Sequence, residues 1–154
     1  MKYIFIMMIC SSCCGTKTTQ TAGTDSSTVV ENSAPAQVIA GKPVALYFGS
    51  VASGPIGDEF LKTWLLNFKA EEKVELTADK FSGCGKEGEY IIVINKMNFS
   101  PDKEEKFTTG LQQLVTDEVK RAKTQSSSAG SVEIRPDPKV EDYSYCRLGS
   151  KKWL

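Results

Sequence analysis

The order of apolar and polar positions between residues 41 and 136 predicts four strands and two helices. Apolar residues at helical spacing predict one helix that begins after Asp58 and a second that begins after Ser100. Short apolar or alternating runs, bounded by glycine, proline or polar residues, predict strands at 44–48, 74–79, 90–94 and 131–135. The predicted order is therefore strand, helix, strand, strand, helix, strand.

Both predicted helices have a recognisable start. Asp58 is a suitable N-cap for the first helix, whose apolar stripe comprises Phe60, Leu61, Trp64, Leu65 and Phe68. The second helix is predicted to start at Ser100-Pro101-Asp102, because proline fits the first helical position and an acid is favoured at the positive end of the helix dipole. It is predicted to end in the polar segment 125–130.

This order resembles the βαββαβ pattern of ferredoxin-like folds, in which two helices cover one face of a four-stranded antiparallel sheet. The first and third strands are central in that topology, and 44–48 and 90–94 are apolar on both faces, as central strands are. The other two strands alternate, which is typical of edges. We therefore predict an α+β domain over 41–136, followed by an irregular C-terminal tail, 137–154, that packs on the domain.

Central strands that are apolar on both faces leave one apolar surface without a cover. Tyr47 and part of the strand 91–94 are expected on the sheet face that points away from the helices. A surface of this kind needs something to pack on it. Two covers remain open: the aromatic tail 138–154 folding back, or a bound protein or ligand.

The first residues have the pattern of a secretory signal. Lys2 is followed by the apolar run 3–9, which is shorter than the roughly 20 residues that a membrane-spanning helix needs. The segment Cys10-Ser11-Ser12-Cys13 resembles the lipobox of bacterial lipoproteins, although that family usually has an aliphatic residue where Cys10 stands. The resemblance implies that a signal peptide, 1–12, is removed.

The same resemblance implies that Cys13 carries an S-diacylglycerol and an N-acyl group, with Cys14 as the second choice of acceptor. The rest of 13–40 is rich in serine and threonine and poor in large apolar residues, so we predict a disordered linker with a reach of roughly 30 Å. The resemblance thus implies a lipid-anchored protein of the cell envelope, which we expect in the outer membrane. Because no acidic cluster follows Cys13 to suggest export to the cell surface, we expect it to face the periplasm.

The charge balance and the lack of histidine exclude several functional classes. The chain has 19 basic and 19 acidic residues, so it offers no basic excess for nucleic acid or for an anionic membrane surface. Without histidine, hydrolases of the usual triad type and histidine-ligated zinc sites are excluded. We predict no catalytic residues, no metal site and no cofactor.

Cys84 and Cys146 are the two cysteines of the region after the linker, and their state stays open. In an oxidising compartment two such cysteines commonly form a disulfide, which here would hold the tail against the turn between the second and third strands. The alternative is a reactive Cys84 near Lys86. The segment 83–88 matches GxGxxG in letters, but it joins two strands, whereas a dinucleotide site needs a strand and a helix.

The sequence therefore predicts an envelope lipoprotein that is a non-catalytic binding or interaction module, not an enzyme. Its expected partners are the membrane, through the lipid anchor, and possible envelope proteins, with no nucleic acid. Two alternatives stay open: a thiol-dependent enzyme or redox protein that uses Cys84, and a protease-inhibitor-like domain, since small βαββαβ domains resemble propeptide-type protease inhibitors.

Overall fold

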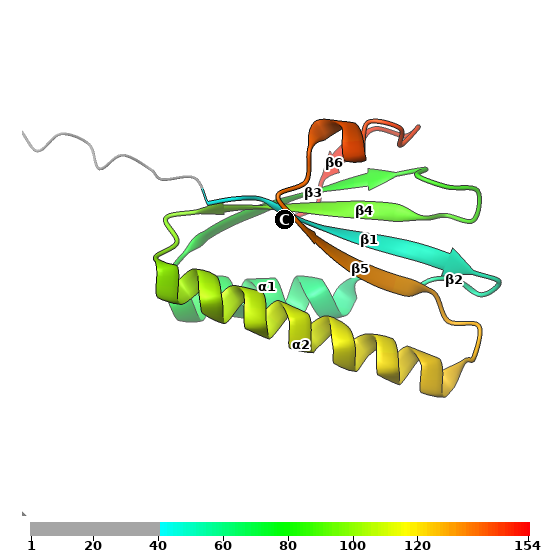
Figure 1. Cartoon of the computed structure of the whole chain (residues 1–154), viewed down its shortest axis with the longest axis horizontal. Coiled ribbons are helices and arrows are strands. Elements are labelled where there is room, and N and C mark those ends of the chain that lie inside the picture. The colour runs from blue at the N-terminus through cyan, green and yellow to red at the C-terminus, as the bar shows by residue number, and fades with distance from the viewer. Residues whose placement is uncertain (1–40) are drawn as a thin grey trace, which may run out of the picture. The chain divides into compact units, whose positions relative to one another are not determined.

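A computed structural model describes residues 41–154 of the chain. The signal peptide 1–12, the lipidation of Cys13 and the linker 13–40 lie outside these residues and stay predictions. Within 41–154, two helices lie on one face of an antiparallel sheet, and part of the C-terminal tail lies on the other face (Figure 1). The predicted α+β class is thus confirmed.

All six predicted elements are present with their predicted type, and the structure adds three short ones. The elements in chain order are β1 (Val44–Val51), β2 (Gly54–Pro55), α1 (Glu59–Glu72), β3 (Glu75–Ser82), β4 (Tyr90–Met97), α2 (Pro101–Gln125), β5 (Ser131–Pro136), the 3₁₀ turn η1 (Val140–Asp142) and β6 (Ser150–Lys152).

The strand order across the sheet is β5, β1, β4, β3, β6, and every neighbouring pair is antiparallel. β1 and β4 are central, as their two-sided apolar pattern predicted. The expectation of four strands and an irregular tail needs correction, because the tail strand β6 pairs with β3 and the short β2 pairs with the end of β1. β6 consists of Ser150, Lys151 and Lys152, whose side chains are all exposed, so only backbone pairing defines it.

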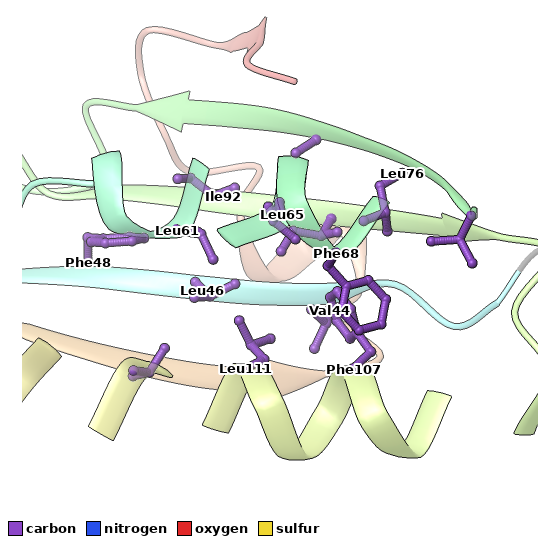
Figure 2. Packing of buried hydrophobic residues seen from close by; sticks show 14 of the residues in the cluster. Val44, Leu46, Phe48, Leu61, Leu65, Phe68, Leu76, Ile92, Phe107 and Leu111 are labelled. Atoms are coloured by element: carbon purple, nitrogen blue, oxygen red, sulfur yellow. The ribbon is translucent and has the colours of Figure 1, made fainter. Parts of the chain in front are cut away.

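The main core lies between the sheet and the two helices (Figure 2). Its aromatic centre is Phe107 of α2, whose ring centroid lies 5.3 Å from that of Phe68 and 5.4 Å from that of Trp64, both on α1. The side chains that are at most 1% exposed include Leu46, Phe48, Leu61, Leu65, Ile92, Ile94, Phe107 and Leu111. The apolar stripe predicted on α1 therefore faces the core.

The two helix starts differ in how they are capped. The hydroxyl of Ser100 accepts a hydrogen bond from the Lys103 amide at 3.4 Å, so the predicted cap of α2 is present. Asp58 occupies the N-cap position of α1, but its side chain makes no capping bond. Its carboxylate instead pairs with Lys80 Nζ at 2.6 Å, and this ammonium also lies 3.7 Å from the ring centroid of Tyr90. The Asp58 carboxylate thus pairs with the half-buried ammonium of Lys80 and does not cap the amide groups at the start of α1.

The tail crosses the outer face of the sheet from the end of β5 to the β3–β4 turn. At its start the Asp137 amide donates to the Pro43 carbonyl at 2.9 Å, and at the far end the Leu148 amide donates to Ser82 at 3.1 Å. Beneath this segment lie Ala45, Ile91 and Val93, which are at most 5% exposed. Of the two covers that the sequence left open, the structure therefore shows the tail.

The end of the chain then turns around the β3 side of the sheet. The amides of Trp153 and Leu154 both donate to the Ala78 carbonyl, at 2.8 and 3.1 Å. Their side chains pack against the main core on the helix side, where Lys62 Nζ lies 5.9 Å from the Trp153 ring centroid. The tail thus contacts both faces of the sheet and one edge.

We expect Phe107→Ala to lower the free energy of unfolding by about 3–5 kcal/mol, because it removes a large side chain from a packed core and leaves a cavity. Urea unfolding followed by circular dichroism measures this change. Leu66→Ala is the control: Leu66 lies on α1 with half of its surface exposed, and the expected change is within about 0.5 kcal/mol. Equal effects of the two substitutions would contradict the described core.

Candidate functional site

The structure joins Cys84 and Cys146 in a disulfide that spans 62 positions of the sequence. The two Cα atoms lie 4.1 Å apart, and Cys146 is 7% exposed within the cluster formed by Ala45, Ile91 and Val93. The Sγ atom of Cys84 is therefore bonded to sulfur here and is not a free thiol. The bond holds the tail on the outer face, close to the point where it meets the β3–β4 turn.

Gly83 is what allows the tail to approach this turn closely. Its φ of +71° lies in the left-handed region that glycine adopts without steric cost. A Cβ atom at this position would lie 3.0 Å from Cγ of Leu148, so a larger residue would push the tail away. Gly83 therefore has a packing role where the tail meets the β3–β4 turn.

Tyr47, Glu133 and Arg135 lie beside the tail, and each has a polar partner. The Tyr47 hydroxyl donates to the Asp142 carbonyl at 3.3 Å, and the Arg135 guanidinium lies 4.1 Å from the Tyr47 ring centroid. Burial raises the pKa of Tyr47, and the hydrogen bond from Arg135 lowers the pKa of Glu133. At neutral pH Tyr47 is thus a neutral donor to the tail, whereas Glu133 is ionised and pairs with Arg135 on the same strand, β5.

Two adjoining hollows lie between α2 and β5, and Gln112 lines both. The first has a volume of about 270 Å³, and its apolar walls are Val44, Phe107, Leu111 and Ile134. The second, along the C-terminal half of α2, has a volume of about 560 Å³ and is lined by Val115, Val119 and Val132, with Lys120 and Lys123 beside them. We call the first the closed hollow, because it is the more enclosed of the two, and the second the open hollow.

The closed hollow also contains a buried ion pair that the sequence pattern did not predict. Lys96 is 4% exposed and is the one buried charged residue within 41–154; its Nζ pairs with Oε1 of Glu104, whose side chain is 40% exposed. The ammonium also lies 5.3 Å from the ring centroid of Phe107. A signal was present, because Lys96 continues the inward-facing series of β4 that includes Ile92 and Ile94.

The open hollow lies along an edge of the sheet. At the opposite edge of the sheet, β6 pairs with β3 through Asp79, Lys80 and Phe81. β5 pairs with β1 through Ser131–Pro136, and within residues 41–154 no other strand pairs with it. An edge strand carries backbone N–H and C=O groups that another chain can use.

No cluster of three or more cysteine, aspartate and glutamate side chains able to hold a metal ion occurs within 41–154. In the same residues, neither α1 nor α2 combines the length and the apolar character that a bilayer-spanning helix requires. Comparisons of the chain with protein families, with curated proteins and with solved structures find no match.

Reduction of the Cys84–Cys146 bond is expected to lower the free energy of unfolding by about 2–4 kcal/mol, because the bond closes a long loop in the unfolded chain. Urea unfolding with and without reductant measures the difference. The double variant Cys84→Ser/Cys146→Ser is the control and should not respond to reductant. An unchanged midpoint for the reduced wild-type protein would contradict a stabilising bond.

Proposed function

We propose that the protein is a lipoprotein of the bacterial cell envelope, anchored in the outer membrane through lipid on Cys13 and facing the periplasm. The lipobox-like segment 10–13 is the main support for the anchor. The Cys84–Cys146 disulfide adds support, because disulfides persist in oxidising compartments outside the cytoplasm.

The domain is, in this proposal, a non-catalytic module that binds a protein partner between α2 and β5. The observation that carries it is the free edge of β5 next to the open hollow. An extended segment of a partner adds to β5 as a further strand, and every second side chain of that segment then lies over Val115, Val119 and Val132. β6 makes the same type of contact within the chain, on β3.

The charges beside the open hollow indicate what kind of segment fits. Lys120 and Lys123 are exposed on α2, and neither forms an ion pair with another residue of 41–154. Acidic side chains on the incoming strand would pair with these ammonium groups, which contributes more to partner choice and association rate than to affinity. The proposed partner is therefore an envelope protein with an extended apolar and acidic segment.

The strand order supports a ferredoxin-like assignment of the domain. The order β5, β1, β4, β3 with all pairs antiparallel is that of a βαββαβ unit, to which β2 and β6 are additions. The fold alone does not define a function. Since the sulfur of Cys84 is bonded, the structure gives no support to the alternative of a thiol nucleophile.

The double substitution Cys13→Ala/Cys14→Ala is expected to abolish lipid labelling of the protein, because the proposed acceptor sulfur and the second-choice acceptor are both gone. Metabolic labelling with a palmitate analogue, followed by fractionation of membranes, measures this loss. Cys14→Ala is the matched control and should retain both labelling and membrane attachment. Loss of labelling in Cys14→Ala, or unchanged labelling of the double variant, would overturn the assignment of the anchor.

A photo-crosslinking amino acid at Ser131 of β5 or at Lys123 of α2 is expected to form an adduct of one defined mass in the native envelope. The same amino acid at Leu66, which is exposed on α1, is the control and should form none. The double substitution Lys120→Glu/Lys123→Glu should reduce the adduct, because it reverses the charge beside the hollow.

Lys86→Glu is the matched charge reversal in the β3–β4 turn and should leave the adduct unchanged. Adducts of equal yield at Leu66 and Ser131, or a loss of adduct with Lys86→Glu alone, would refute binding at β5.

A further inference from the structure

We infer that the closed hollow is a binding site for a small carboxylic acid with a short apolar chain, and that Lys96 binds its carboxylate. This inference does not depend on the proposed protein partner at β5. It follows from the shape of the hollow, from the burial of Lys96 and from the position of Glu104.

The hollow has the size and the lining of a site for a small amphipathic molecule. Its volume of about 270 Å³ corresponds to roughly nine water volumes, so a ligand of about nine non-hydrogen atoms fits. Val44, Phe107 and Leu111 are each at most 8% exposed, and together with Ile134 they form an apolar wall. Among the polar lining residues, which also include Lys42, Thr108, Gln112 and Asp137, Lys96 is the one that is buried. A ligand with its polar end at Lys96 and its apolar end against this wall therefore matches the lining.

The ammonium of Lys96 fixes the chemistry of the polar end. A buried ammonium is strongly unfavourable unless an anion pairs with it. Lys96 is buried among aromatic rings, with Nζ 5.3 Å from the ring centroid of Phe107 and 6.0 Å from that of Phe99. In this environment the group selects an anion over a neutral alcohol or a second cation.

Glu104 occupies the position that we assign to the ligand carboxylate. Its carboxylate pairs with Lys96 Nζ, but 40% of its side chain is exposed, so it can turn into solvent and be hydrated there. Exchange of one carboxylate for another leaves the charge around Lys96 unchanged. The second ion pair of the hollow, Lys42 with Asp137, is 79% and 58% exposed and lies at the surface, where it is screened by water.

Because the Glu104 carboxylate and the ligand carboxylate compete for Lys96, removal of Glu104 should strengthen ligand binding. A tethered group competes at an effective concentration of roughly millimolar, so the wild-type protein should bind a small carboxylate weakly. Glu104→Gln removes the competitor and keeps the shape of the side chain, so it should increase the affinity. Lys96→Met removes the cation and keeps an apolar chain of similar length, so it should abolish binding.

The test is a titration of the full mature protein with hexanoate, hexylamine and hexanol, followed by calorimetry and by NMR of the methyl groups of Val44, Leu111 and Ile134. We expect hexanoate alone to bind, about tenfold more tightly to Glu104→Gln than to the wild type, and not at all to Lys96→Met. Lys86→Met, in the exposed β3–β4 turn outside the hollow, is the matched control and should bind like the wild type. Thr108→Trp, which fills the hollow from α2, should also block binding.

Glu104→Gln leaves Lys96 without its carboxylate partner and can lower the stability of the protein, so thermal unfolding provides a second measurement. Hexanoate should then raise the melting temperature of Glu104→Gln and leave that of Lys96→Met unchanged. Failure of hexanoate to bind Glu104→Gln, or equal binding to Lys96→Met, would overturn the inference. Because these assays contain no envelope partner, their outcome is independent of the crosslinking at β5.

Discussion

The apolar outer face of β1 and β4 is the constraint on which the arrangement of the tail depends. Two central strands that carry apolar side chains on both faces need a cover on each side. The two helices cover the inner face, whereas Ala45, Ile91 and Val93 on the outer face are covered by 137–148. The tail after β5 meets this requirement on the outer face, and a disulfide joins it to the β3–β4 turn.

The path of the tail also determines which part of the sheet stays available. After the disulfide the chain forms β6, which pairs with β3, and then places Trp153 and Leu154 against the main core. One side of the sheet is therefore occupied by the chain itself. The free edge of β5 and the hollows beside α2 lie at the opposite edge, which is where we propose that a partner adds.

The sequence predicted the elements well where apolar periodicity determines them. Leu61 and Leu65 on α1, and the two-sided runs of β1 and β4, are in the core because burial of these side chains dominates the energetics. β6 escaped prediction because it consists of backbone hydrogen bonds between exposed residues, which leave no apolar pattern. The role of Asp58 depended on Lys80, 22 positions later, and such a pairing is a tertiary effect that local capping rules do not include.

Lys96 is a charged residue at a position of β4 where the alternating pattern of the strand and its burial both favour an apolar side chain. Its place in the inward series of β4 calls for an apolar residue, and a buried ion pair is in general no more stabilising than well-packed apolar side chains of similar volume. Stability alone therefore gives little reason for a lysine there. An ammonium held at the end of an apolar hollow by a half-exposed carboxylate does, however, provide a position where one anion can replace another. Departures from local consistency of this kind are expected at functional sites, which favours binding over a purely structural role for Lys96.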